Sequence, residues 1–208
     1  MKTAIQKNAI LLAIFAVVAT AIVSIISLLT QPRIERQEQA QLLSTLASII
    51  EPSSHNNDLY QDCHLLNDPI FSSKQQTYYI AKQGETPVAF AITTSAPDGY
   101  NGNIDLIVAM DLNGKVTGVR TLKHQETPGL GDKIELRKDD WILSFAGKSV
   151  EGEKDMRWAV RKDGGVFDQF TGATITPRAV VNTVKRTVLY VSKNQEILLA
   201  NQQMCRSE

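Results

Sequence analysis

The sequence predicts an α+β protein in which a single N-terminal transmembrane helix precedes a domain of antiparallel strands packed with a few helices. Three observations support this prediction. An uncharged apolar run lies near the N-terminus, alternating apolar runs separated by turn residues fill the middle, and one long helix with an apolar stripe lies near the C-terminus. At 208 residues, the chain is long enough for one ordinary domain with appendages.

The apolar run covers residues 9–29, AILLAIFAVVATAIVSIISLL, and contains no charged side chain. As a helix it would extend about 32 Å at about 1.5 Å per residue, which is enough to cross a bilayer core of about 30 Å. A cleaved signal peptide is the alternative, but its apolar region is usually about 7–15 residues long and ends at a small-x-small site. The run is longer and SLLTQPR offers no good site, so the sequence favours an uncleaved anchor.

Positive charges near the anchor do not decide its orientation. Lys2 and Lys7 precede the apolar run, and Arg33 and Arg36 follow it, so the two ends are balanced. On charge alone, residues 1–8 could lie on either side of the membrane.

Residues 30–60 are predicted to form an amphipathic helix and a linker. After Pro32, the segment IERQEQAQLLSTLASII (34–50) places its large apolar residues on one side of a helix, namely Leu42, Leu43, Leu46, Ile49 and Ile50. The segment EPSSHNND (51–58) then breaks the helix with proline, serine and asparagine.

Strand-like patterns begin after this linker. TYYIAK (77–82) and PVAFAITT (87–94) flank a short polar turn, as the strands of a hairpin do. The segment 103–124 holds two alternating runs around an Asn-Gly pair, which favours a tight turn with positive φ at Gly114. The segment WAVRKDGGVFDQF (158–170) is predicted to form a further hairpin around its Asp-Gly-Gly turn.

Two segments of the predicted domain are helical. DWILSFAG (140–147) is short. The main helix is predicted to begin at Pro177, with Thr176 as its N-cap and proline at the first helical position. Its valines form a stripe at helical spacing that would face the core: Val180, Val181, Val184, Val188 and Val191.

Composition and motifs exclude several classes of function. The 22 basic and 22 acidic residues balance, which argues against a nucleic-acid partner. The sequence lacks a phosphate loop, a GxGxxG dinucleotide fingerprint and a GxSxG nucleophile elbow. His55, His64 and His124 are scattered and are expected to be surface residues, so no metal site is predicted.

The two cysteines, Cys63 and Cys205, lie far apart in the sequence and lack the spacing of a thiolate metal site. If the domain lies outside the cytoplasm, a disulfide that joins the C-terminal tail to the segment after the anchor is favoured. Otherwise, they would be two unrelated buried thiols.

Two loops are rich in turn residues and could approach a ligand. APDGYNG (96–102) contains Tyr100, which could stack on an aromatic group, and KHQETPGLGDK (123–133) contains glycines that let backbone N–H groups come close to a ligand. Composition alone favours simple connectors for both loops.

The start of the main helix is a candidate anion site. In DQFTGATITPRAVVNTVK (168–185), Gly172 can turn the chain ahead of the helix. The free N–H groups of a helix N-terminus suit a phosphate, and the Thr174 hydroxyl lies beside them. An ordinary capped helix start explains the same residues equally well.

The stretch DQFTGAT (168–174) resembles the flavinylation motif of the FMN-binding domain family, in which the last threonine carries FMN through a phosphoester bond. The wider chain resembles the G subunit of the Rnf (Rsx) electron transport complexes, and it is related in plan to the C subunit of the sodium-translocating NADH:quinone reductase. This likeness rests on the single N-terminal span and on APDGY, HQETPGLGDKIE, KDGG and FDQFTGATITPRAVV in this order.

The resemblance implies a set of flavin-binding residues. Thr174 would be the covalent acceptor, and Asp168 would help to recognise the acceptor or to activate its hydroxyl. The backbone cradle, which is also the signature read by the attaching enzyme, would consist of Thr171, Gly172 and Ala173. A second loop would lie along the flavin, with Leu130 against the ring, and would comprise Glu126, Thr127, Gly129, Leu130 and Gly131.

The resemblance also implies partners and a location. A separate flavin transferase would attach the FMN, using FAD and a divalent metal and releasing AMP. The N-terminus would be cytoplasmic, and residues 61–192 would form a periplasmic FMN-binding domain at the inner membrane, followed by a tail of residues 193–208. The other partners would be membrane lipid and the membrane and peripheral subunits of the complex.

The implied function is electron transfer within a redox-driven, ion-translocating complex. The flavin supplies the redox chemistry, so the chain needs no catalytic side chain of its own. Electrons from carriers such as NADH or ferredoxin would pass to other redox subunits, coupled to movement of Na⁺ or H⁺, although some members of the family keep a redox-sensing transcription factor reduced. The alternatives are a non-redox periplasmic interaction or assembly module and a stand-alone periplasmic flavin reductase.

Overall fold

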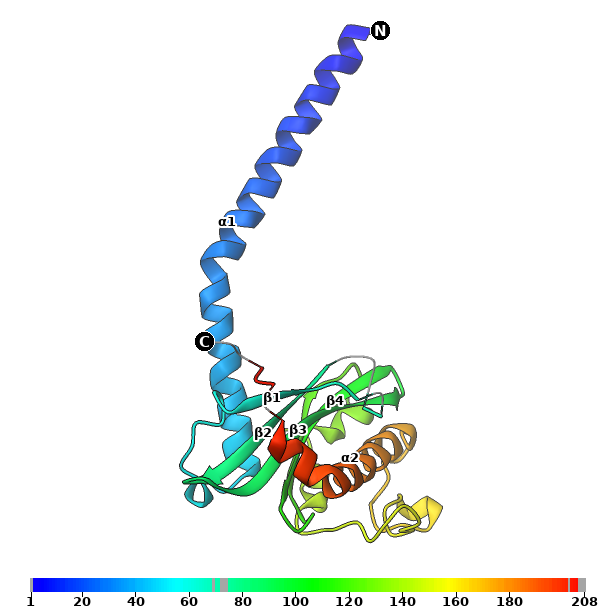
Figure 1. Cartoon of the computed structure of the whole chain (residues 1–208). Helices are drawn as coiled ribbons and strands as arrows, with labels where there is room; N and C mark the ends of the chain where they lie inside the picture. The colour runs from blue at the N-terminus through cyan, green and yellow to red at the C-terminus, as the bar shows by residue number, and fades with distance from the viewer. Residues whose placement is uncertain (1, 69, 72–74, 202, 206–208) are drawn as a thin grey trace. The chain divides into compact units, whose positions relative to one another are not determined.

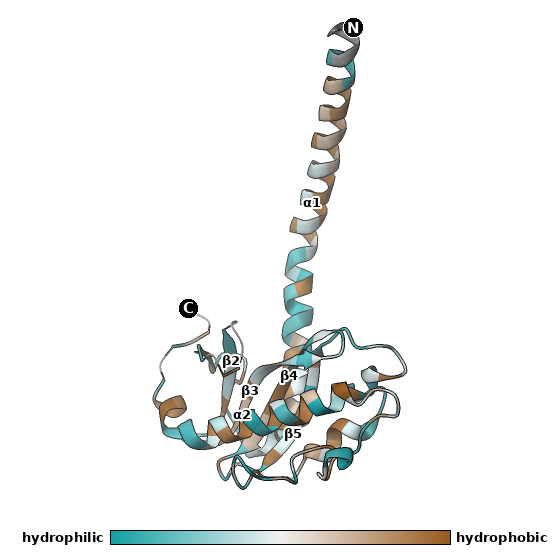
Figure 2. Cartoon of the chain, turned by 90° about the vertical axis from the view of Figure 1, so that its right-hand side faces the viewer, coloured by the Kyte–Doolittle hydropathy of each residue, from teal (hydrophilic) through white to brown (hydrophobic). Residues whose placement is uncertain are grey.

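The computed structural model describes residues 2–68, 70–71, 75–201 and 203–205 (Figure 1). The chain divides into two units between Leu42 and Leu43. The first unit belongs to helix α1, which runs from Lys2 to Ile49 and reaches into the second unit. It is the one helix among the described residues that is long and apolar enough to cross a membrane. Figure 2 shows apolar residues along its first part and more hydrophilic ones in the turns that follow.

The helix predicted for residues 34–50 is present, but it continues helix α1 through Pro32 and is not divided from the apolar segment. Proline removes one backbone donor, but the sequence places no further helix-stopping residue beside it. Thr30 adds a bond from its hydroxyl to the Ile26 carbonyl, 2.9 Å away. The apolar and amphipathic segments therefore form a single helix.

The second unit is built on a five-stranded antiparallel sheet with strand order β1-β2-β3-β4-β5, which confirms the predicted α+β class. The strands are β1 (Cys63–Leu66), β2 (Gln76–Gln83), β3 (Thr86–Gly99), β4 (Gly102–Asp111) and β5 (Val116–Lys123). The predicted turn between β4 and β5 is present, and Gly114 has a φ of +75°. Strand β1 was not predicted, because four residues are too few to display an alternating pattern.

Helix α2 (Ile175–Ala200) packs against one face of the sheet, where its predicted valine stripe is buried. The paired positions Tyr78, Ile92, Val108 and Val119 form a row on this face. The row on the opposite face consists of Tyr79, Ala91, Ala109 and Gly118. The small residues of this row, Ala91, Ala109 and Gly118, make room for the end of α1 and the residue after it, where Leu46, Ile49 and Ile50 are buried. A Cβ atom on Gly118 would lie 2.8 Å from the Ile49 side chain.

The hairpin predicted for residues 158–170 is absent, and that prediction was wrong. The segment forms a short 3-10 helix, η4 (Arg161–Asp163), and a single parallel bridge between Val160 and Phe167. Its apolar residues follow strand-like spacing, yet they enter one aromatic cluster that includes Trp158 and Phe145. Burial of these side chains, and not strand pairing, therefore fixes the segment. The short helical segment near residue 140 is the 3-10 helix η3 (Asp140–Phe145).

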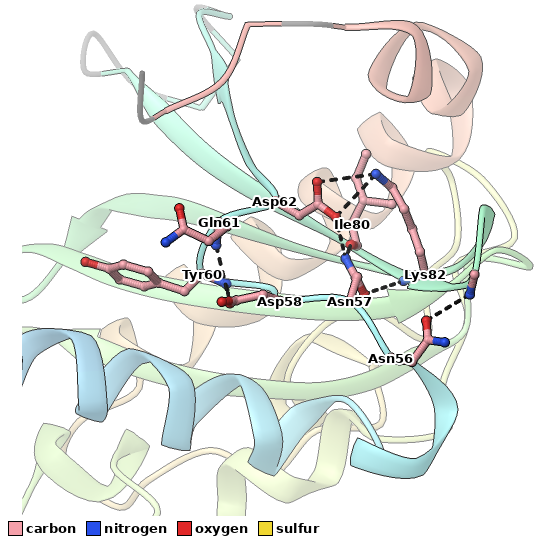
Figure 3. A network of polar contacts seen from close by, with 9 residues as sticks. Asn56, Asn57, Asp58, Tyr60, Gln61, Asp62, Ile80 and Lys82 are labelled. Atoms are coloured by element: carbon pink, nitrogen blue, oxygen red, sulfur yellow. Dashed lines mark hydrogen bonds and ion pairs between the residues drawn. The ribbon is translucent and has the colours of Figure 1, made fainter. Parts of the chain in front are cut away.

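The segment between α1 and β1 is bound to strand β2 by polar contacts (Figure 3). The Asn57 side chain donates to the Ile80 carbonyl at 2.8 Å and accepts from the Lys82 amide at 2.8 Å. Lys82 also forms an ion pair with Asp62, and Asn56 accepts from the Gly84 amide. These contacts attach the predicted linker to the sheet.

A disulfide joins Cys63 to Cys205, the pairing that the sequence favours if the domain lies outside the cytoplasm. Helix α2 continues to Ala200, beyond the predicted domain limit at 192, and Leu198 is buried in the core. The chain then returns to β1, where the Leu65 amide donates to the Gln203 carbonyl. The C-terminal segment thus covers the outer edge of β1.

His64 is buried beside this disulfide, contrary to the expectation of a surface histidine, and it stacks on Tyr78. Burial lowers the pKa of its imidazole below the usual value, Lys82 adds to this effect, and Asp62 opposes it. The unfolded chain therefore binds this proton more readily. We expect the free energy of unfolding to fall as the pH drops below the unfolded value of about 6.5.

Thermal unfolding of the chain in detergent at about pH 7.5 and about pH 5.5 tests this expectation. A His64→Phe variant keeps an aromatic ring next to Tyr78 but cannot take up a proton. It should lose less stability between the two pH values than the parent. An equal loss in both proteins would assign the pH dependence to other groups.

Candidate functional site

A cleft of about 250 Å³ lies where three segments of the second unit meet. These segments are the turn between β3 and β4, the loop after β5 and the start of α2. The residues that line it are Tyr100, Glu126, Thr127, Leu130, Gly131, Gly172, Ala173, Thr174, Ile175 and Thr176. The two loops that the sequence singles out therefore meet at the helix start, although they are distant in the sequence.

Most of the predicted flavin-binding residues lie in this lining, but three do not. Gly129, Asp168 and Thr171 are absent from it, and all three are exposed. Thr174 lies in the cleft and is half-buried. The structure thus separates residues that face the cleft from motif residues that face solvent.

Helix α2 begins at Ile175 with Thr174 as its N-cap, so the prediction of Thr176 as the cap was wrong. The Thr174 hydroxyl makes no capping hydrogen bond to the helix, because its backbone already has helical dihedral angles. The amides of Ile175 and Thr176 belong to the first turn, where a helix offers no carbonyl partner. The helix start therefore offers the cleft a threonine hydroxyl that makes no capping hydrogen bond and first-turn amides that lack a carbonyl partner within the helix.

Thr176 cannot act as the cap because its hydroxyl is bound to Glu126. Both side chains are buried, and the Thr176 hydroxyl donates to Oε2 of Glu126 in a short hydrogen bond. The other carboxylate oxygen, Oε1, accepts from the Asn101 amide at 3.1 Å. Glu126 therefore connects all three segments of the cleft. Its contact with Thr176, on the helix, joins positions that are 50 residues apart in the sequence.

The loop after β5 is braced by hydrogen bonds of its own. The Glu126 amide donates to Nδ1 of His124 at 3.0 Å, and Nε2 of His124 lies 2.6 Å from Glu135. The His124 side chain is therefore largely buried and supports the loop through hydrogen bonds, contrary to the expectation of a surface residue. The hydrogen bond from Arg137, assisted by His124, lowers the pKa of the Glu135 carboxyl. The carbonyl of Thr127 accepts from the amides of Leu130 and Gly131 at 3.1 Å each.

Two glycines are required by the shape of the cleft. Gly172 has a φ of +78°, a conformation that favours glycine, and it places the backbone near Leu130. A Cβ atom on Gly131 would lie 2.8 Å from Oε2 of Glu126 and 2.9 Å from the Thr176 hydroxyl. Larger residues at these positions would close the cleft or displace the carboxylate.

The first residues of the DQFTGAT motif are fixed by contacts with a buried tryptophan. The Trp141 indole N–H donates to the Asp168 carbonyl at 2.8 Å, and its ring packs edge-on against buried Phe170. The Asp168 side chain points to solvent, where it forms an ion pair with Arg161 at 3.0 Å. Asp168 is thus available to an external protein and does not line the cleft.

Sequence reasoning missed part of the lining. Tyr100 was recognised only as a possible stacking residue, and Ile175 was not recognised. Tyr100 follows Gly99 in the β3–β4 turn, and Asn101 ties this turn to Thr127 through a 3.3 Å hydrogen bond. The exposed apolar side chains of Tyr100, Leu130 and Ile175 were the available signal.

Fold and site together define an FMN-binding domain attached to a helix that is long and apolar enough to cross a membrane. Residues 99–188 match the model of the FMN-binding domain family, and residues 1–49 match that of the RnfG N-terminal region. The chain belongs to the family of the G subunit of the ion-translocating oxidoreductase complex.

Curated relatives of this name cover nearly the whole chain. The protein of Shewanella loihica is 54% identical over 99% of this chain and 98% of its own length. That of Vibrio atlanticus is 53% identical over 100% of both chains, and that of Erwinia tasmaniensis is 50% identical over 92% of this chain and 91% of its own.

Proposed function

We propose that the chain holds FMN in the cleft as a phosphoester of Thr174 and relays electrons within an Rnf-type complex. As a member of the RnfG family with an FMN-binding domain, the chain is a flavoprotein subunit of the Rnf ion-translocating oxidoreductase complex. The covalent part of the proposal rests on the Thr174 hydroxyl, which lies in the cleft at the start of α2 and makes no capping hydrogen bond.

The lining of the cleft suits the two ends of FMN. The first turn of α2 offers unpaired amides and a partial positive charge of about half a unit, which favour a phosphate. Tyr100, Leu130 and Ile175 offer exposed apolar surface, which favours a flat aromatic ring. FMN, when bound, accepts and donates one or two electrons, so the chain supplies orientation and electrostatics.

As the family likeness implies, a separate flavin transferase would attach the FMN half of FAD. In the proposed reaction, Oγ1 of Thr174 forms a bond to the phosphorus of the FMN half, and AMP leaves with the electrons of the broken bond. A base on the flavin transferase takes up the hydroxyl proton. The exposed Asp168 and Thr171 are suited to recognition by this enzyme, since their side chains face away from the cleft.

The proposed location of the domain is the periplasm, with the N-terminus in the cytoplasm. The Cys63–Cys205 disulfide supports this side, because disulfides persist in oxidising compartments. An anchor in the lipid bilayer would keep the flavin near the other subunits. A phosphoester tether would prevent loss of the cofactor to bulk solvent.

Replacement of Thr174 by alanine is expected to abolish covalent flavin completely, because the acceptor oxygen is removed. Wild type and Thr174→Ala, each produced with an active flavin transferase, would be compared by in-gel fluorescence after denaturation. Thr117→Ala removes the hydroxyl of an exposed threonine on β5, away from the motif, and serves as the control, which should remain fluorescent. Intact mass should show an increment of FMN less water, localised to Thr174 by fragmentation.

Three outcomes would contradict the proposal. A fluorescent Thr174→Ala band would place the attachment elsewhere. Absence of flavin from the wild type, with the transferase active on another substrate, would favour the non-redox interaction module. Isolation of a flavin-bearing chain that never associates with other redox subunits would favour the stand-alone reductase.

A further inference from the structure

The cleft contains one charged residue among the described residues that line it, and this residue is an acid. Glu126 is only 4% exposed, although the ligand proposed for the cleft carries a phosphate. A buried carboxylate weakens the binding of an anion. Its presence in this cleft therefore suggests another role. We propose that Glu126 is a positioning residue whose fixed negative charge also disfavours electron uptake by the flavin. This inference rests on the proposed function.

The surroundings of Glu126 are built for a carboxylate that accepts at both oxygens. The Asn101 amide donates to Oε1 at 3.1 Å, and the Thr176 hydroxyl donates to Oε2. These two hydrogen bonds fix the orientation of the carboxylate group. Both oxygens are thus occupied by protein donors, so Glu126 acts on the flavin through charge and through the geometry of the cleft.

Close backbone packing holds the carboxylate in place. A Cβ atom on Gly131 would lie 2.8 Å from Oε2, and one on Gly99 would lie 3.0 Å from Oε1. Glycines on two separate loops thus allow the backbone to enclose the carboxylate. The same contacts fix the first turn of α2, because Thr176 is bound to Glu126 and cannot fold back to cap the helix.

None of the ion pairs between described residues includes Glu126. Two basic side chains of the segment 124–138 are paired with other acids. His124 pairs with Glu135, and Lys138 pairs with Asp132. A buried charge is also poorly screened by salt. Its field therefore extends into the cleft.

The expected effect is a shift of the redox equilibrium. Electrons added to the flavin increase negative charge near Glu126, so the carboxylate favours the oxidised form. A unit charge at roughly 10 Å, in an effective dielectric of about 20, changes such an equilibrium by about tenfold. Glu126→Gln removes the charge and preserves the shape, because its amide can still accept from Asn101.

The full-length chain, loaded with FMN by the transferase, would be titrated with dithionite against a reference dye. At a fixed dye ratio, we expect Glu126→Gln to hold about tenfold more reduced flavin relative to oxidised flavin than the wild type. Asp98→Asn, the same change at an exposed site on the β3–β4 hairpin, should alter the ratio less than about twofold and should lose its effect in high salt. Thr176→Val breaks the hydrogen bond without changing charge and should lower thermal stability more than it alters the ratio.

The failures are distinguishable. A wild type without covalent FMN would overturn the proposed function. A loaded Glu126→Gln with the wild-type ratio would overturn only the role of its charge. A folded Glu126→Gln that cannot be loaded with FMN would also overturn the role of the charge, because Glu126 would then be a residue needed for attachment.

Discussion

Phe145→Ala is expected to destabilise the domain by about 3–5 kcal/mol, the range for removal of a buried aromatic ring. Phe145 is fully buried and lies in the 3-10 helix η3. Its ring contacts Trp141, Trp158 and Phe167, at centroid distances of 5.3, 6.0 and 4.6 Å. An alanine would leave a cavity that three aromatic side chains on separate segments cannot fill.

The measurement is urea or thermal unfolding of the chain in detergent, followed by tryptophan fluorescence. Leu143→Ala is the matched control, because Leu143 lies in the same short helix but is 42% exposed. Its effect should be about 0.5 kcal/mol or less. Equal losses in the two variants would mean that the aromatic cluster is not a main source of stability.

Gly165→Ala is expected to destabilise the domain by about 3 kcal/mol, at the upper end of the range for overpacking. A Cβ atom there would lie 1.8 Å from the Ala159 carbonyl oxygen, which is part of the backbone and accepts from the Phe167 amide. The chain can relieve this clash only by moving Phe167 and the motif that follows it. We therefore expect Gly165→Ala to reduce flavin attachment as well as stability.

The adjacent Gly164 provides the control. It has a φ of +87° and open space where a Cβ atom would lie, so Gly164→Ala meets backbone strain without a clash. Its expected cost is about 1 kcal/mol, with flavin attachment retained. In-gel fluorescence and thermal unfolding of both variants measure the two effects. Normal attachment in Gly165→Ala would show that the motif does not depend on this packing.

The regular part of the fold was predictable because each element satisfies a local rule. Strands β2 to β5 are short segments rich in apolar and β-branched residues and bounded by turn residues, and the valines of α2 recur at helical spacing. The Asn-Gly pair suited the β4–β5 turn. In each case, the local pattern and the tertiary packing favour the same structure.

The failures occur where tertiary contacts override a local pattern. Residues 158–170 alternate like a strand, but Trp158 and Phe167 are drawn into the cluster around Phe145. The sequence predicted Thr176 as the cap of α2, but this side chain is bound to Glu126, which is distant in the sequence, and Thr174 is the N-cap. A single sequence contains no local signal for such a contact.

The residues around Thr174 were predictable from the sequence, but the hydrogen bonds of Glu126 that join the segments of the cleft were not. The family likeness pointed to Thr174 and to the loop of residues 126–131, and the structure brings them into one cleft. The likeness placed Glu126 in a loop that would lie along the flavin, and the structure adds that both of its oxygens accept hydrogen bonds from protein donors. Its role could be inferred only after the three segments were seen together.

The burial of the last turn of α1 sets the minimum size of a water-soluble fragment. Leu46, Ile49 and Ile50 each contribute roughly 1.5–3 kcal/mol through burial, and they cover the small-residue face of the sheet. A polypeptide that starts at β1 would expose this face and would also lose Asn56 and Asn57. Proteolytic release of a lasting product therefore requires cleavage ahead of Leu43, and cuts nearer to β1 would yield aggregating material.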